Sequence, residues 1–354
     1  MNILQPVLDS AIQDILDHAG DVSEEELLST IEKAMPSLVE NTARSVLSAI
    51  KSDMDDGLKE KTENRQRFEQ RLIDRWQKPL SLLELLVSIV TEVGHDFNDS
   101  FRDDAARSND YRFDVLMRLQ ARASKTASAI LVLLRSGHAD DACARWRTLH
   151  EIAVVSWFIK DANQDVAERY LLHEIIHQYK AALQLQRYAS RLNESPLSQF
   201  EFNRLETRRN CLVAKYGKPF KENYGWAASA LKKNSPSFAD IEDAVDLEHW
   251  RPYFKMASDN THANAHGMMF QLGIADHQIG KVMLAGPSNA GLADPGHWTA
   301  ISLQQVTLNL LTTKTSLDSV VVMLILEELQ DEIGDAFLEA HRALEAEIQK
   351  NQGV

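Results

Sequence analysis

The chain has 354 residues, of which 44% are hydrophobic and 25% charged, and these proportions are ordinary for a globular protein. Its net charge of −14 opposes non-specific adhesion to nucleic acid or to an anionic membrane, although a local basic patch can still contact RNA. Fourteen glycines and nine prolines are few for this length, because β-rich folds need frequent turns. The composition therefore favours an all-α fold.

Residues 1–76 predict an N-terminal helical subdomain. Residues 2–18 carry apolar side chains at helical intervals, and Ser23 with Glu26 forms the signature of a capping box at the start of the next helix. Residues 51–75 are strongly charged and contain few apolar side chains, which is typical of an exposed helix. Nothing in this subdomain matches a catalytic pattern, so we expect it to serve in homo-oligomerisation or in contact with a partner protein.

Residues 77–354 predict the main bundle, in which long apolar helices with short connections pack antiparallel. Helices are expected over residues 80–97, 114–135, 139–160, 164–193, 199–216, 247–265, 298–329 and 331–349. Residues 273–296 are the least regular part and predict a surface loop. No alternation of apolar and polar residues persists as it would in strands, so the all-α prediction extends over the whole chain.

Two features predict a cytoplasmic protein without membrane contact. The amphipathic and acidic N-terminus lacks the basic start and the cleavage site of a signal peptide. The longest apolar run, residues 320–326, is far too short to span a bilayer.

The helix expected over residues 139–160 carries ionisable side chains inside an apolar pattern, where they are costly to bury unless they are paired. Arg147 and Glu151 are one turn apart and share a face. They form either a structural ion pair between helices or a site in which Arg147 presents a fixed cation to a phosphate or carboxylate. Arg145 and His150 show the R-x4-H spacing of helical ribonucleases of the HEPN type, but five positions on a helix turn two side chains about 140° apart.

The segment after this helix contains a literal H-E-x-x-H motif at residues 173–177. On one helix, His173 and His177 can bind Zn²⁺ while Glu174 activates a water molecule. No third ligand is evident in the sequence, and the sheet that zinc proteases normally build beside this helix is not predicted. A zinc-dependent hydrolase is therefore kept as an alternative.

Two further stretches are candidates for binding. The first is a dense polar set at the end of an apolar helix, formed by Tyr253, Ser258, Asp259, Asn260, Thr261, His262, Asn264 and His266. Histidines one turn apart at a helix C-terminus are explained by capping or by a site role. The second is a basic patch that faces the single acid Glu206 and consists of Arg204, Arg208, Arg209, Lys215, Lys218 and Lys221. A solvated helix face explains it, and contact with RNA is the alternative.

The stretches RSGHADDACARWRTLHEIAVVSWFI, AERYLLHEII, YGWA and YFKMASDNTHANAHG, taken together, resemble a prokaryotic family known as domain of unknown function 5677. The resemblance covers about residues 115–270. Arg147 and Glu151 occupy its R-x-x-x-E motif, and Ser258 and His262 occupy its S-x-x-x-H motif. The resemblance implies a kinship with helical ribonucleases of the HEPN type.

Our leading hypothesis is a composite site that cleaves RNA phosphodiesters without a metal cofactor, in phage defence or in a toxin system. Arg147 would bind a phosphate oxygen, Glu151 would orient it, and His262 would act as general acid or base. The other candidate residues are His266 and Asp259 for catalysis and Arg145, Asn260 and Tyr253 for substrate binding. The alternatives are the zinc hydrolase and a non-catalytic sensor or interaction subunit whose buried charges specify helix packing.

Overall fold

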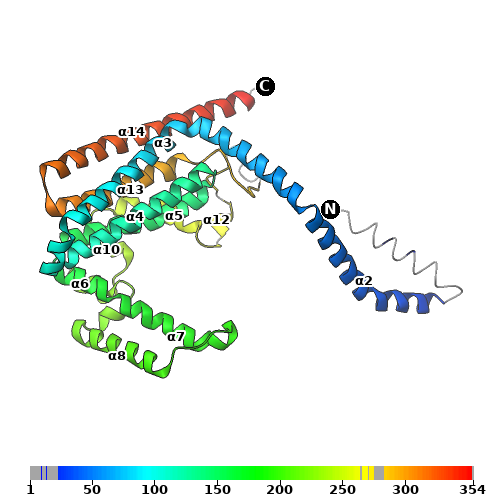
Figure 1. The fold of residues 1–354 in the computed structure, drawn as a ribbon, viewed down its shortest axis with the longest axis horizontal. Helices are drawn as coiled ribbons and strands as arrows, with labels where there is room; N and C mark the ends of the chain where they lie inside the picture. Colours follow the sequence, from blue (N-terminus) through cyan, green and yellow to red (C-terminus); the bar gives the residue numbers. More distant parts are fainter. Residues whose placement is uncertain are drawn as a thin grey trace. The chain divides into compact units, whose positions relative to one another are not determined.

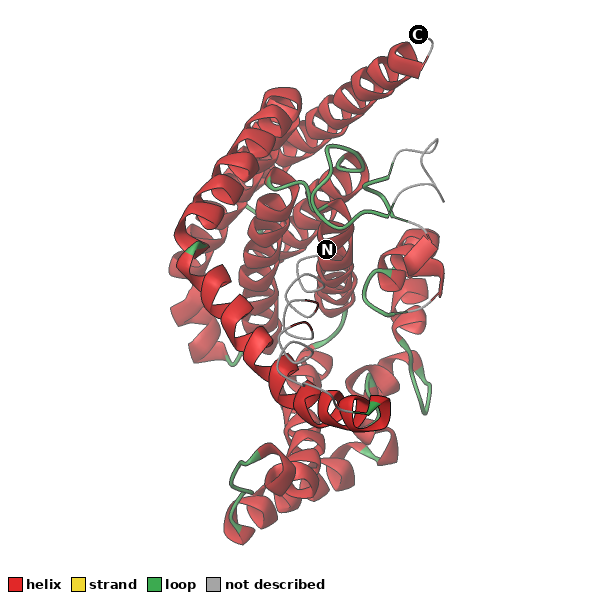
Figure 2. Ribbon diagram, turned by 90° about the vertical axis from the view of Figure 1, so that its right-hand side faces the viewer, coloured by secondary structure: helices red, strands yellow, loops and turns green. Residues whose placement is uncertain are grey.

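The computed structural model of the chain describes residues 9, 13, 23–263, 265–269, 271–274 and 283–352. Over these residues it consists of helices and connecting loops and contains no strand, which confirms the all-α prediction (Figures 1 and 2). Contacts between Cα atoms divide the chain into two units, Met1–Gln70 and Arg71–Val354. None of the described helices combines the length and the apolar character that crossing a bilayer requires.

The first unit contains helix α2, Glu24–Ser52, and the beginning of the long helix α3, Met54–Ser108. The predicted capping box is confirmed at the start of α2. The Ser23 hydroxyl accepts a hydrogen bond from the Glu26 backbone N–H, and the Glu26 carboxylate accepts one from the Ser23 N–H. Most of the described side chains of this unit are exposed, and they include several large apolar ones.

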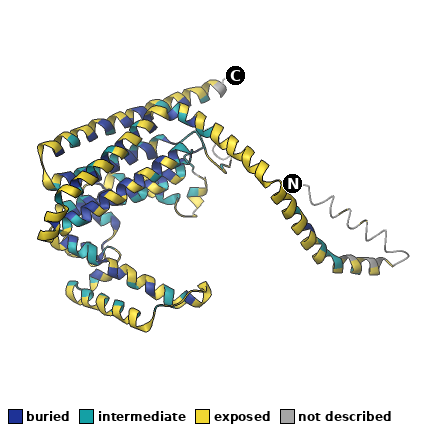
Figure 3. Cartoon of the chain, viewed as in Figure 1, coloured by how far each residue is buried: buried dark blue, intermediate teal, exposed yellow. Residues whose placement is uncertain are grey.

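The second unit is a bundle organised around helix α5, Ala139–Asp161. This helix packs against α4, Tyr111–Arg135, and α13, Ala293–Leu311, and α13 in turn packs against α14, Leu317–Gln352. Figure 3 shows the buried residues concentrated on α4, α5 and α13. The fully buried Trp146 joins α5 to α13, because its Nε1–H donates to the Trp298 carbonyl oxygen at 3.0 Å and to the Ser302 hydroxyl at 3.1 Å.

Shorter elements lie between α5 and α13. They are α6 Gln164–Leu172, α7 Glu174–Leu192, α8 Gln199–Tyr216, η1 Lys218–Lys221, η2 Gly225–Ala227, α9 Ala228–Leu231, α10 Phe238–Ala244, η3 Glu248–Trp250, α11 Arg251–Asp259 and α12 Ala265–Met269. A further 3₁₀ turn, η5 Thr312–Lys314, follows α13. Three of the predicted helices are shorter than expected. The one expected over 298–329 ends at Leu311, and α14 continues through the break expected at residue 330. The helix expected over 164–193 is interrupted at His173, and the one expected over 247–265 ends at Asp259.

Candidate functional site

The residues of the R-x-x-x-E motif and the serine of the S-x-x-x-H motif meet where α5 contacts α11. The Arg147 Nη2 atom lies 3.1 Å from Glu151 Oε1, and its Nε–H donates to the Ser258 hydroxyl at 2.8 Å. The same hydroxyl donates to the Phe254 carbonyl oxygen at 2.7 Å. The guanidinium also lies over the Phe254 ring, 4.6 Å from its centroid. Arg147 is thus fixed by an ion pair, a hydrogen bond and a cation–π contact.

Glu151 also lines an open polar cavity of about 580 Å³. The cavity is bounded by α4, α5, α6, α7, α10, η2 and the loop between η1 and η2, and its ionisable lining residues are Arg122, Glu151, Tyr170, His177 and Tyr224. Burial raises the pKa of the Glu151 carboxyl, and the positive charge of Arg147 acts against this shift. Burial also lowers the pKa of the His177 imidazole. A carboxyl and an imidazole with shifted pKa values therefore share one cavity.

Arg122 brings a second positive charge to this cavity. It is exposed on α4 and lines the cavity, and its charge acts to lower the pKa of both Glu151 and Tyr170. Burial raises the pKa of the Tyr170 and Tyr224 hydroxyls, and Glu151 adds to the shift at Tyr224. Sequence reasoning missed Arg122, Tyr170 and Tyr224. An arginine on an exposed helix face and tyrosines inside an apolar pattern carry no local signal of a site.

His150, the residue before Glu151, is buried and does not line this cavity. Its side chain is 2% exposed, and its Nε2 atom lies 3.0 Å from Oε1 of the fully buried Glu242. The other carboxylate oxygen of Glu242 pairs with Arg251 at the start of α11. Burial lowers the pKa of His150 to about 4, so the ring is neutral at pH 7 and donates its N–H to the carboxylate. Arg145 is exposed, so the helical rotation separates it from His150 as predicted.

The H-E-x-x-H residues have three different environments. His173 ends α6, and its buried Nε2 atom lies 3.0 Å from the Phe220 carbonyl oxygen and 2.9 Å from that of Glu222. This nitrogen therefore donates a hydrogen and has no lone pair to offer a metal. Glu174 is exposed and accepts a hydrogen bond from Gln178, whereas His177 faces the Glu151 cavity. Among the described residues, no group of three or more His, Cys, Asp and Glu side chains is placed to hold a metal ion.

His262 lies just after α11 and lines a different cavity, with a volume of about 510 Å³. This cavity shares no lining residue with the Glu151 cavity, and its lining includes Asp259 and Asn260. His266 is exposed, and its Nδ1 atom lies 2.9 Å from the Asp259 carboxylate. The residues assigned to one composite site thus divide into two groups, one around Glu151 and one around His262.

Of the remaining predicted residues, Tyr253 is 46% exposed and packs on the Trp298 ring at 4.9 Å between centroids. Asn264 lies outside the described residues. The cations of the basic patch are carried by α8 and the 3₁₀ turn η1. Arg204 and Arg208 are exposed there, whereas Lys215 approaches Glu168 at 3.4 Å.

The model of a family of unknown function, DUF5677, matches residues 113–279. The chain is similar to that family over these residues, which make up just under half of its length. We call these residues the DUF5677 segment. It contains the R-x-x-x-E and S-x-x-x-H motifs, every lining residue of the Glu151 cavity and the basic patch, whereas the cavity beside His262 also has lining residues beyond it. No curated protein and no solved structure matches the chain. The match confirms the family resemblance and assigns no activity, so any function is inferred from the geometry.

Proposed function

We propose that the DUF5677 segment cleaves RNA phosphodiesters at the Glu151 cavity and acts in phage defence or in a toxin system. One observation carries the proposal. A single open cavity holds a carboxyl with a raised pKa, an imidazole with a lowered pKa and an exposed arginine. Titratable groups whose pKa values are shifted by their surroundings and that share a cavity are candidates for acid–base catalysis.

The reaction needs only the RNA and groups that accept and donate protons. The 2′-hydroxyl oxygen forms a bond to the adjacent phosphorus, and the bond from phosphorus to the 5′-oxygen breaks. Glu151 accepts the proton of the 2′-hydroxyl, because its raised pKa makes the carboxylate a stronger base. His177 in its protonated form donates a proton to the 5′-oxygen. The products are a 2′,3′-cyclic phosphate and a 5′-hydroxyl.

The two arginines have separate tasks in this proposal. Arg147 is engaged by Ser258, Glu151 and the Phe254 ring, so it orients the Glu151 carboxylate. Arg122 is exposed at the cavity and supplies a cation for a phosphate oxygen as negative charge develops. The exposed cations of α8, among them Arg204 and Arg208, are positioned to contact the RNA backbone outside the cavity.

The proposal is tested with purified protein and a single-stranded RNA labelled at its 5′ end. We expect cyclic-phosphate products from RNA and none from DNA of the same sequence, which lacks the 2′-hydroxyl. Glu151→Gln is expected to slow cleavage by about 10²-fold or more. Arg122→Ala weakens cleavage, and the control Arg191→Ala, an exposed arginine at the end of α7, leaves it unchanged. The proposal fails if folded Glu151→Gln and Arg122→Ala proteins cleave as fast as the wild type.

His262 provides a second acid–base candidate within the same experiment. If His177→Ala keeps activity while His262→Ala loses it, the proton donor is His262, as the sequence suggests, and the 510 Å³ cavity is part of the active site. If only His177→Ala is inactive, the acid belongs to the Glu151 cavity.

A non-catalytic binding function is favoured by a different observation. Both ionic clusters on α5 hold it to neighbouring helices, Arg147 through Ser258 of α11 and His150 through Glu242 of α10. If the clusters serve only to shape a binding surface, RNA is bound and returned intact. In that case Arg122→Ala changes the affinity for RNA, and the wild type yields no cyclic phosphate.

A further inference from the structure

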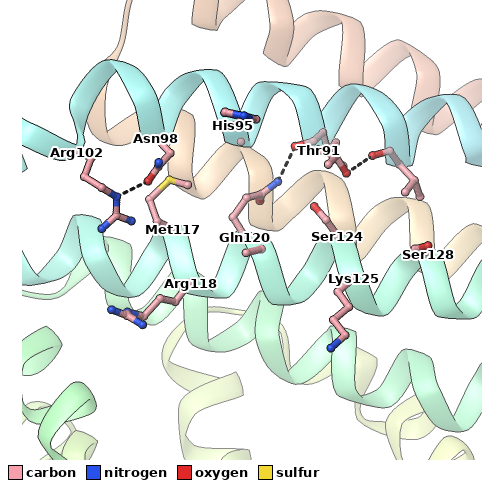
Figure 4. Close-up of a pocket in the computed structure, with 14 residues that line it drawn as sticks. Thr91, His95, Asn98, Arg102, Met117, Arg118, Gln120, Ser124, Lys125 and Ser128 are labelled. Carbon is pink, nitrogen blue, oxygen red and sulfur yellow. Dashed lines mark hydrogen bonds between the residues drawn. The ribbon is translucent and has the colours of Figure 1, made fainter.

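Another cavity, of about 660 Å³, is an open groove between α3 and α4 (Figure 4), and it shares no lining residue with the Glu151 cavity. Its walls are mainly apolar and include Val87 and Val90 from α3 and Met117 and Ala121 from α4. Binding sites for small molecules typically have this size and a mostly apolar lining with a few polar groups. The groove therefore has the dimensions of a ligand site.

Small side chains keep the groove open. Gly94 is buried in the middle of the α3 wall, and a Cβ atom there would lie only 3.2 Å from Cγ of Gln120 on α4. Ala121 is exposed on the opposite wall, where a larger side chain would fill the space. The wall residues of α3 from 87 to 98 extend over about 16 Å of helix, which is long enough for a medium-length acyl chain.

The Gln120 side chain at the floor of the groove does not need a hydrogen bond from a ligand. Gln120 is 1% exposed, and its Nε2 atom donates to the Val90 carbonyl oxygen at 3.1 Å and to the Thr307 hydroxyl at 3.2 Å. Thr307 donates in turn to the Gln120 side-chain oxygen at 3.3 Å. Figure 4 shows Gln120 between the two helices, with Met117 beside it. Because the buried amide is satisfied within the protein, an apolar chain lying on it leaves no polar group unpaired.

The lining is positively charged, although the chain as a whole is strongly negative. Three arginine or lysine residues line the groove, Arg102, Arg118 and Lys125, and none of the lining residues is an aspartate or glutamate. Asp114 lies behind the first two, 3.8 Å from Arg102 and 3.0 Å from Arg118. One carboxylate thus faces two guanidinium groups, and the three side chains together keep a net positive charge. Lys125 is exposed and has no ion-pair partner among the described residues.

We propose that this groove binds an anionic amphiphile, whose apolar chain lies between α3 and α4 and whose carboxylate or phosphate group is held by Lys125 or by the Arg102–Arg118 pair. The apolar wall disfavours the binding of a fully polar anion, and the positive charges of Arg102, Arg118 and Lys125 disfavour the binding of a cationic amphiphile. The proposal does not depend on the RNA-cleaving activity, because the groove shares no lining residue with the Glu151 cavity.

The test is titration calorimetry of the full chain with decanoate below its micelle-forming concentration, with decyltrimethylammonium and acetate as comparison ligands. Decanoate is expected to bind, whereas acetate and decyltrimethylammonium bind at least tenfold more weakly. Ala121→Trp fills the groove from an exposed position and abolishes decanoate binding. Lys125→Glu weakens it about fivefold, and the control Arg191→Glu, outside the groove, leaves it unchanged.

Circular dichroism and the melting temperature establish that each variant is folded. The proposal is overturned if decanoate does not bind to the wild type. It is also overturned if the folded Ala121→Trp protein binds decanoate as tightly as the wild type. Equal binding of decanoate and decyltrimethylammonium would show an apolar surface without charge selection and would equally reject an anion site. If cross-linking captures an acidic helix of a partner protein in the groove and decanoate does not bind, the groove binds a peptide and the proposal is wrong.

Discussion

His150 and Glu151 occupy neighbouring positions on α5, and their surroundings differ in solvent and in partners. His150 lies in a closed cluster with Glu242 and Arg251, and the histidine and glutamate side chains are 2% and 0% exposed. Glu151 is 31% exposed, pairs with Arg147 and lines an open cavity. A rotation of about 100° between successive residues of a helix is enough to turn one side chain into the core and the next one out of it.

The difference separates two uses of buried charge. In the closed cluster the buried Glu242 carboxylate pairs with both His150 and Arg251, so the cluster specifies how α5, α10 and α11 pack. In the open cavity, a carboxyl with a raised pKa faces solvent-accessible space beside an arginine. We therefore interpret the His150 cluster as part of the scaffold and propose the Glu151 cavity as the functional site.

The largest expected effect comes from breaking the closed cluster. Glu242→Ala leaves Arg251 and the His150 N–H without their buried partner, and we expect the free energy of unfolding to fall by about 3–5 kcal/mol. Urea unfolding measures the change. Glu248→Ala, which removes an exposed carboxylate a few residues away, is the matched control and should change stability by less than about 0.5 kcal/mol. A small effect of Glu242→Ala would remove the distinction between the two regions.

Lowering the pH should also destabilise the fold through its buried histidines. The pKa of His150 is lowered from 6.5 to about 4 by burial, and that of His173 is lowered similarly. Both rings are neutral in the fold, so the unfolded chain takes up protons first as the pH falls below 6.5. Stability is therefore complete above pH 6.5 and is lost as the pH falls towards 4, by about 2 kcal/mol per histidine at pH 5.

The contribution of His150 is isolated by comparing the wild type with His150→Gln, which keeps an N–H for Glu242 but does not titrate. The free energy of unfolding of the variant should fall less between pH 7 and pH 5 than that of the wild type. If the two proteins lose the same stability over this range, the neutral buried state assigned to His150 is wrong.

Helical geometry made part of this arrangement predictable from the sequence. One-turn spacing placed Arg147 and Glu151 on one face, and a five-residue separation turned Arg145 away from His150. Apolar periodicity and the scarcity of turn residues were sufficient for the all-α fold, because these signals are local and repeated along the whole chain.

The partners of these side chains were not predictable, because they come from distant segments. Glu242 is 92 positions from His150, and the carbonyl oxygens that hold His173 belong to a short 3₁₀ turn and the residue after it. The H-E-x-x-H spacing presumed one uninterrupted helix, whereas the chain interrupts the helix at His173 itself. The Glu151 cavity could not be predicted from the sequence for the same reason. Its lining is drawn from five α-helices, one 3₁₀ turn and a loop, and only tertiary packing brings them together.

A smaller effect is expected at the contact between α5 and α11. Ser258→Ala removes the acceptor of the Arg147 Nε–H, and we expect the free energy of unfolding to fall by about 1 kcal/mol. Ser258→Thr keeps a hydroxyl at this position and should retain most of the stability. The measurement sharpens the comparison, because the pair of Arg147 and Glu151 is about one-third exposed and the hydrogen bond of Arg147 competes with water. A loss as large as that of Glu242→Ala would place Arg147 with the scaffold.

The smallest effect on stability is expected at Glu151 itself. Glu151→Gln replaces a carboxylate whose ion pair with Arg147 is about one-third exposed, and such pairs contribute only about 0–1 kcal/mol. The amide keeps the shape of the side chain and can still accept a hydrogen bond from Arg147. We therefore expect urea unfolding of Glu151→Gln to match the wild type closely, while RNA cleavage slows by about 10²-fold or more. A strongly destabilised Glu151→Gln protein would show that this carboxylate holds helices together as Glu242 does, and the open cavity would then lose its catalytic base.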